Sequence, residues 1–160
     1  MRIALPFVIL LAGCPTPADE PGDEPGDAAA WPVWEAADAF EVEPNDPTPQ
    51  DLGTIAPNYS VAGRSGACGG DGGWADADID RLAFTFADDA FVRIRLRAEG
   101  ADLDLEVYDP DGDVLGIEDG TGTDDEVLDV ALEAGATYSA RIRCWLGNDD
   151  RWILAFADRG

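Results

Sequence analysis

The sequence predicts an all-β domain of the antiparallel sandwich or barrel class. Apolar and polar residues alternate with a period of two through most of the chain after residue 40, and Gly, Asp and Pro interrupt this alternation roughly every eight to twelve residues. Such short alternating segments between turn residues are typical of β-sandwiches and barrels. No segment longer than a few residues has the apolar spacing of a helix. About 120 residues are enough for one hydrophobic core.

The strands are expected where the alternation is clearest. Because successive side chains of a strand point to opposite faces of the sheet, each alternating segment provides one core face and one solvent face. Residues 91–97 alternate strictly, with arginines on one face. The expected strands are residues 82–86, 91–97, 102–108, 127–132, 137–144 and 152–156.

One strand pairing can be predicted from the side chains. A two-residue turn at Glu99 and Gly100 would join segments 91–97 and 102–108 in a hairpin. Each arginine of the first strand would then face an acid of the second, and every inward pair would be apolar. A slip of one residue would place arginines opposite leucines, so the charges would fix the register. The alternative use of this basic stripe, binding of a polyanion, is disfavoured because the hairpin neutralises it.

The N-terminus has the features of a bacterial export signal. Arg2 precedes an apolar run of about ten residues, which is too short to span a bilayer that needs ~20 helical residues. Residues 11–14 read Leu-Ala-Gly-Cys and resemble the lipobox of bacterial lipoproteins, in which the cysteine is acylated. We predict a signal peptide at residues 1–13 and a lipid anchor on Cys14 in the cell envelope, at the outer membrane or cell surface or on the periplasmic side. The alternative is an ordinary secretory signal with a chance cysteine.

Residues 14–39 are expected to form an acidic, disordered tether. They are rich in Pro and Gly, contain two copies of Glu-Pro-Gly-Asp and have few apolar residues, so they cannot bury enough surface to fold. Trp31 and Trp34 do not fit this composition. We expect them to begin the packing against the domain, at residues 40–160, with a binding patch as the alternative.

The charge of the chain limits its functions. The formal net charge is −24, the chain has no histidine, and all ten cationic residues are arginines. Such a surface repels nucleic acid, so we expect no nucleic-acid partner. The absence of histidine excludes histidine-dependent catalytic triads and histidine zinc sites.

The cysteines predict one disulfide. With Cys14 assigned to the lipid, Cys68 and Cys144 remain as an even pair in an oxidising compartment. Joined, they would close a loop of roughly 75 residues, for which the chain-entropy model gives ~4 kcal/mol of stabilisation. Two separate, reduced thiols are the alternative.

The order of several acidic and apolar elements resembles that of a known family. These elements are residues 41–46, 78–84, 101–112, 132–138 and 141–143. Together they resemble the bacterial pre-peptidase C-terminal domain, which is related to the collagen-binding domains of clostridial collagenases. The resemblance covers about residues 40–158 and implies a jelly-roll-like β-sandwich of about eight strands. The sequence departs from the family at Leu82, where an aromatic residue is usual, and in the glycine-rich stretch 66–74; the domain is also expected to stand alone on its tether rather than after a protease.

The resemblance also implies a structural Ca²⁺ site. The collagen-binding relatives bind calcium through the acidic opening segment and the acidic start of the following strand. Carboxylate and amide oxygens suit calcium, and a divalent cation would offset the repulsion among gathered carboxylates. The sequence does not indicate which of the aspartates at the start of that strand points inward. A solvated acidic face with a turn at residues 45–46 is the alternative to a metal site. The matching residues are Glu41, Glu43, Asn45, Asp46, Asp78 and Asp80, with Asp76 as a further candidate.

Two other acidic segments are interpreted as loops. Residues 109–113 begin like an EF-hand loop, but Val114 stands where that loop needs glycine and Gly120 where it needs an acid, so a β-turn is expected. Residues 119–126 are expected to form a loop, with a weak second cation site as the alternative.

These observations predict a non-catalytic envelope lipoprotein whose calcium-stabilised β-sandwich is an accessory or adhesion-type module. The expected contacts are the membrane, through the lipid, and an extracellular polymer or protein. Acids are too abundant for any pair to indicate glycoside hydrolysis, and no nucleophile has a recognisable base beside it. Two alternatives stay open: a carbohydrate- or protein-binding module that uses exposed aromatics, or a purely structural envelope lipoprotein. The candidate aromatics are Trp74, Trp145 and Tyr59.

Overall fold

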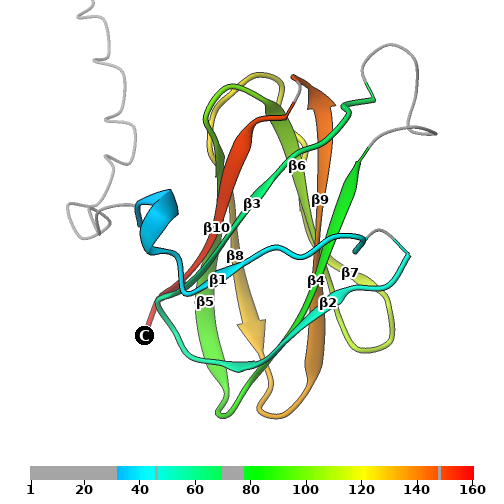
Figure 1. The fold of residues 1–160 in the computed structure, drawn as a ribbon. Coiled ribbons are helices and arrows are strands. Elements are labelled where there is room, and N and C mark those ends of the chain that lie inside the picture. The colour runs from blue at the N-terminus through cyan, green and yellow to red at the C-terminus, as the bar shows by residue number, and fades with distance from the viewer. Residues whose placement is uncertain (1–31, 46, 70–77, 148) are drawn as a thin grey trace, which may run out of the picture. The chain divides into compact units, whose positions relative to one another are not determined.

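The fold is known from a computed structural model that describes residues 32–45, 47–69, 78–147 and 149–160 (Figure 1). The predicted signal peptide, Cys14, Trp31 and Trp74 lie outside the described residues. One compact unit extends from Pro32 to Gly160. Among the described residues, no helix has the length and apolar character needed to cross a bilayer.

The described strands form a β-sandwich of two five-stranded sheets, as the sequence predicts. Most neighbouring strands are antiparallel, but β1 pairs with β3 and β2 pairs with β4 in parallel. The sheets are therefore mainly antiparallel, with one parallel pair in each. Sheet A contains, in spatial order, β1 (Ala39–Phe40), β3 (Tyr59–Arg64), β10 (Arg151–Asp158), β5 (Ala90–Ala98) and β8 (Glu126–Leu132). Sheet B contains β2 (Gln50–Ile55), β4 (Ile79–Phe86), β9 (Thr137–Leu146), β6 (Asp102–Tyr108) and β7 (Val114–Glu118).

The core lies between the two sheets and follows the period-two pattern of the sequence. In β10, alternate residues from Trp152 to Phe156 are fully buried, while their neighbours are only half-buried. Phe84 of β4 contacts Phe156 edge to face across the sandwich, with ring centroids 4.8 Å apart. All six predicted strands are present. Strands β1, β2, β3 and β7 are shorter or less regular in pattern and were not predicted individually.

The predicted hairpin between residues 91–97 and 102–108 is wrong. The first segment is β5 of sheet A and the second is β6 of sheet B, so residues 99–101 cross from one sheet to the other. Arg93 instead makes two hydrogen bonds of 2.8 Å to Asp129, and Arg97 makes bonds of 2.7 and 2.6 Å to Asp125. The arginines of β5 are thus neutralised by acids in and just before β8.

Two further predictions concern links in the chain. The disulfide between Cys68 and Cys144 is present, 76 residues apart in the sequence, and it ties the segment after β3 to the end of β9. Residues 109–113 form the expected turn between β6 and β7. In this turn the backbone N–H of Gly112 donates to the carbonyl of Asp109 at 3.1 Å, and Gly112 has a φ of +86°.

Candidate metal centre

Three carboxyl groups converge at one end of the sandwich. Glu41 and Glu43 follow the short strand β1, and Asp80 belongs to β4 of the other sheet. One oxygen from each lies within 4.8 Å of the others. Of the described residues, this is the one group of three or more His, Cys, Asp or Glu side chains that meets this distance. Residues from both sheets, 37 positions apart or more in the sequence, therefore form one cluster, which we call the end cluster.

Asp80 enters the end cluster from the core face of β4. It lies opposite Ile142 of β9 and has the same parity as Leu82, and both of these neighbours are buried. Asp80 is only 2% exposed. Trp152 Nε1 donates to its Oδ2 at 2.9 Å, whereas its Oδ1 is buried and accepts no hydrogen bond. A buried carboxylate oxygen without a donor is costly unless a proton or cation lies against it.

Glu41 is held on sheet A by the backbone of β3. Its N–H donates to the carbonyl of Ala62 at 2.8 Å, and its Oε2 accepts the N–H of Arg64 at 2.9 Å. Gly63, between these two residues, leaves the space that the cluster needs. A Cβ at this position would overlap the side chains of Trp152 and Glu41.

Asn45 fixes the loop that carries the two glutamates. Its side chain is 1% exposed, and its Nδ2 donates to Glu41 Oε1 at 2.9 Å. Its Oδ1 accepts the N–H of Arg81 at 3.2 Å, and its own N–H donates to Glu43 Oε2 at 3.0 Å. Because its amide oxygen already accepts the backbone of β4, Asn45 acts as a brace between the loop and the strand.

The mutual proximity of the three carboxyls perturbs their pKa values. Burial, a hydrogen bond with Glu41 and the neighbouring negative charges raise the pKa of Asp80 to about 10. Partial burial and contact with Glu41 raise the pKa of Glu43 to about 7. Burial opposes ionisation of Glu41 too, but its hydrogen bonds with Asp80, Glu43, Arg64 and Asn45 outweigh it and lower its pKa. Without a cation, the cluster therefore still holds protons near neutral pH, where free carboxyl groups have already released theirs.

Nothing in the described part of the chain supplies a positive charge to this cluster. The ion pairs that the described arginines form involve other acids. The donor set is oxygen only, without the thiolate or imidazole that zinc prefers. Such a set fits a hard divalent cation, and calcium more than magnesium because it tolerates irregular geometry.

The structure brings together some of the predicted metal residues and not others. Glu41, Glu43 and Asp80 meet, and Asn45 supports them. Asp78 lies near enough to raise the pKa values of Asp80 and Glu43, but its Oδ2 accepts the N–H of Gly66 at 2.5 Å and it is not one of the three. Asp46 and Asp76 lie outside the described residues.

Two residues of the site were not predicted from the sequence. Trp152 was expected only as a core residue of its strand, and Gly63 was not singled out. The alternation of segment 152–156 places Trp152 on the core face. Because a buried indole N–H needs an acceptor, this position could have indicated a polar partner nearby.

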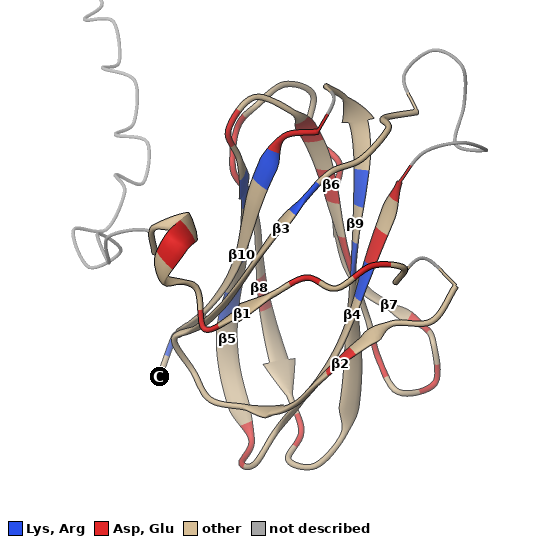
Figure 2. Ribbon diagram, viewed as in Figure 1, with Lys and Arg blue, Asp and Glu red and all other residues tan. Residues whose placement is uncertain are grey.

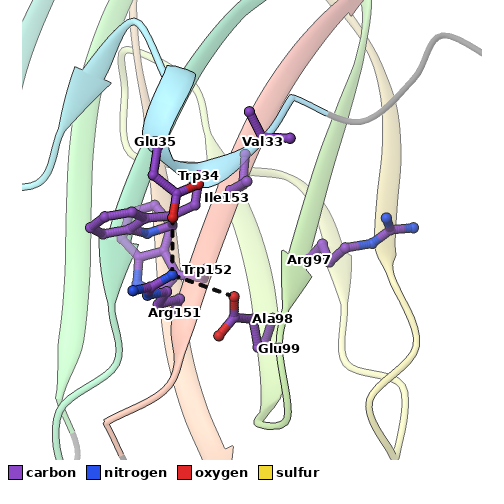
Figure 3. Close-up of a pocket in the computed structure, with 9 residues that line it drawn as sticks. All are labelled: Val33, Trp34, Glu35, Arg97, Ala98, Glu99, Arg151, Trp152 and Ile153. Atoms are coloured by element: carbon purple, nitrogen blue, oxygen red, sulfur yellow. Dashed lines mark hydrogen bonds and ion pairs between the residues drawn. The ribbon is translucent and has the colours of Figure 1, made fainter.

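The aromatic residues near the N-terminal end of the domain pack rather than form an open platform (Figure 3). Trp34, in the 3₁₀ turn Trp34–Ala36, donates from Nε1 to the carbonyl of Gly63 at 3.2 Å. Arg151 lies over its ring, 4.6 Å from the centroid, and also pairs with Glu35 and Glu99. Phe40 contacts the ring edge to face at 5.0 Å. The adjoining cavity of about 290 Å³ is thus lined by an indole that already contacts Arg151, Phe40 and the carbonyl of Gly63, as expected for packing.

The other candidate aromatics give little support for stacking on a ligand. Tyr59 is half-buried and packs against the core. Trp145 is 37% exposed near the end of β9. Tyr59 forms no ring contact with another described aromatic residue.

Comparison with known proteins supports the fold class. No protein-family model matches the sequence, and no curated protein matches it. Among solved structures, 28 chains are similar. One is the pre-peptidase C-terminal domain of a collagenase from Bacillus anthracis, with 13% identity and a TM-score of 0.50 over 68% of this chain and 95% of that one. Another is PliG of Aeromonas hydrophila, a periplasmic inhibitor of g-type lysozyme, with 17% identity and a TM-score of 0.40 over 68% and 98%. The first likeness supports a distant fold relationship with the pre-peptidase C-terminal domain.

Proposed function

We propose that this protein is a non-catalytic, lipid-anchored accessory or adhesion-type module of the cell envelope, braced by a calcium ion at the end cluster. The observation that carries the proposal is the convergence of Glu41, Glu43 and Asp80 within 4.8 Å, with a buried Asp80 oxygen that accepts no hydrogen bond. The anchor on Cys14 is inferred from residues 11–14 alone.

The position of the end cluster suggests what the ion does. Glu41 is bonded to β3 of sheet A, and Asp80 is part of β4 of sheet B. A cation held between them would join the two sheets at one end of the sandwich and fix the segment by which the chain enters the domain. Calcium binds six to eight oxygens, so backbone carbonyls, waters or both would complete the shell around these carboxylates.

A bracing role also agrees with the position of the entry segment. Residues 38–41 contact the domain mainly through β3, where Asp38 accepts hydrogen bonds from the N–H and hydroxyl of Ser60 at 2.8 and 3.1 Å. If a lipid tether precedes this segment, any force on the anchor reaches the domain here. A divalent ion that also contacts β4 would spread that force over both sheets.

Thermal unfolding of the purified protein in excess EDTA and then in millimolar calcium tests the proposal. Binding to the folded state alone raises stability by ~2.7 kcal/mol at a hundredfold excess over Kd, or several degrees in Tm. We expect a saturable rise that magnesium does not reproduce and that Glu43→Gln largely abolishes. Glu133→Gln is the matched control, because this exposed glutamate lies outside the end cluster.

The proposal fails if calcium gives no shift, or if magnesium gives an equal one. An equal shift in the Glu43→Gln and Glu133→Gln variants would likewise show general screening of an acidic surface rather than a site.

A further inference from the structure

The outer face of sheet B carries a row of four side chains in register across four strands. Arg81 of β4 lies opposite Arg141 of β9, Arg141 lies opposite Glu106 of β6, and Glu106 lies opposite Ile117 of β7. The chain neighbours of the first three residues are buried in the core, so these side chains point away from it. Three spacings between strands make the row about 14 Å long.

The arginines and acids of this face are not evenly matched. Glu106 pairs with both Arg141 and Arg143, with 2.6 Å between its Oε1 and the NH2 of Arg143, and it also accepts the hydroxyl of Tyr108. Asp104 lies 3.6 Å from Arg143. Both acids belong to β6, on one side of β9. The charged segments of β4 and β9 run side by side in Figure 2.

Arg81 lies on the other side of β9 and forms no ion pair with any described acid. Its Nε, like that of Arg141, is buried and donates no hydrogen bond. The charged residue directly opposite it is Arg141, another cation. Like charges opposite one another and a buried N–H without an acceptor both cost stability. This cost is unexpected in a chain with 34 acids and ten arginines.

The opposite end of the row is apolar and exposed. Ile117 is 47% exposed, and Leu115, two residues earlier on the same strand, is 43% exposed. Their strand β7 is an edge of sheet B. Between the two ends lies Tyr108, with Arg141 over its ring at 5.3 Å from the centroid. Arginine and tyrosine are enriched in protein-binding hot spots, and the apolar side chains beside them offer surface that a partner can bury.

We propose that the outer face of sheet B docks a protein partner that presents a carboxylate side chain to Arg81 and Arg141 and an apolar side chain to Leu115 and Ile117. A guanidinium group can bind a carboxylate through two parallel hydrogen bonds, and a carboxylate from a partner would supply the counter-charge that Arg81 lacks among the described acids. A partner that spans about 14 Å is a protein segment rather than a small anion. The overall charge of −24 repels polyanions, so it favours a partner with few, well-placed acids. This inference does not depend on calcium.

The first test uses a peptide of matching length. In an extended chain, residues four apart lie on the same face and ~13 Å apart. The probe is acetyl-Glu-Ser-Ala-Ser-Leu-amide, and its control is the same peptide with glutamine in place of glutamate. NMR of arginine Nε–Hε groups during titration with millimolar peptide should show shifts at Arg81 and Arg141. We expect at least fivefold weaker binding for the glutamine peptide and for the Arg81→Gln variant.

Two further variants separate recognition from a structural role. Arg93→Gln is the matched control, since Arg93 lies on sheet A and is bonded to Asp129; it should bind the peptide as the wild type does. Arg81→Glu places an acid opposite Arg141, so it should raise Tm by about 2 °C and abolish binding. Absence of any shift at Arg81, or unchanged affinity in Arg81→Gln, overturns the proposal. A lower Tm for Arg81→Glu would also overturn it, because Arg81 would then support the fold.

Discussion

Two groups of acids in this domain differ in how the charge of their buried member is balanced. On the outer face of sheet B, Glu106 is 3% exposed but lies between Arg141 and Arg143, which neutralise it. At the end of the sandwich, Asp80 is 2% exposed and its charged neighbours are Glu41 and Glu43. Asp80 and Glu106 are equally buried, and they differ in whether the chain provides a counter-charge.

The difference indicates where to look for function in a strongly charged domain. An acid such as Glu106, held between two arginines, stabilises the fold without an external cation. An unmatched charge lowers stability until something binds to it, so it is retained at a cost. The end cluster is an excess of acids, and Arg81 is an excess cation; both features point to a ligand of opposite sign.

The largest effect is expected from breaking the neutralised network. Glu106→Gln keeps the shape of the side chain but leaves Arg141 or Arg143 without a carboxylate. Loss of one partner from a buried charge pair should lower the free energy of unfolding by ~3 kcal/mol. Urea unfolding measures this, with Glu133→Gln as the control that should change little.

The loss for Glu106→Gln should be the same in EDTA and in calcium, because the network contains its own cations. A loss below ~0.5 kcal/mol would show that this network resembles an exposed ion pair. A loss that depends on calcium would mean that the two acidic sites are not independent.

The effect of Asp80→Asn on stability should have opposite signs in EDTA and in calcium, which makes this variant the most direct test of the comparison. In EDTA, asparagine removes an uncompensated buried acid, accepts the N–H of Trp152 and donates to Glu41, so the variant should be more stable by ~1–3 kcal/mol. In saturating calcium the variant lacks a ligand and should be less stable than the wild type. Thermal unfolding in the two buffers measures both differences. Destabilisation by a similar amount in both would show that Asp80 serves the fold without an ion.

The strands could be predicted from the sequence, but their partners could not. Period-two alternation identified all six long strands, because one buried face imposes that pattern on each. The partner of 91–97 was wrong because several strands carry complementary charges. The arginines of β5 could pair with the acids of β6 or with those near β8, and Arg141 and Arg143 of β9 could pair with β6. Local charge matching cannot choose between such pairings, which the packing of both sheets decides.

The candidate site was predicted in part for a similar reason. Resemblance indicated Glu41 and Glu43, and period two places Asp76, Asp78 and Asp80 on the same face as Leu82. Which of the aspartates enters the cluster depends on where β4 begins and on its register with β9, where Asp80 meets the buried Ile142. Arg81 gave no signal in the sequence, because a lone arginine among so many acids is expected to find a partner.

A third acidic group, at Glu126, lies between the two extremes and gives the smallest predicted effect. Burial, and after it the negative charges of Glu118, Asp104 and Asp102, raise the pKa of Glu126 to about 7. A hydrogen bond from the N–H of Gly120 partly opposes this rise. The folded state therefore holds a proton that the unfolded state, with a pKa near 4.5, has released. The stability that this bound proton contributes to the fold is fully present below pH 4.5 and is lost as the pH rises through 7.

Glu126→Gln tests whether burial without a full counter-charge costs stability here too. At pH 8 the wild-type carboxylate is ionised in the fold, so the variant should be more stable by ~1–2 kcal/mol. Below pH 4.5 the wild-type group is protonated in the folded state and largely protonated in the unfolded state, so the two proteins should be nearly equal there. Tm measured from pH 4 to 8 at constant calcium gives the difference, and Glu133→Gln should show no such trend. A variant that is equally stable at both pH values would place Glu126 with the neutralised acids around Glu106 rather than with the end cluster.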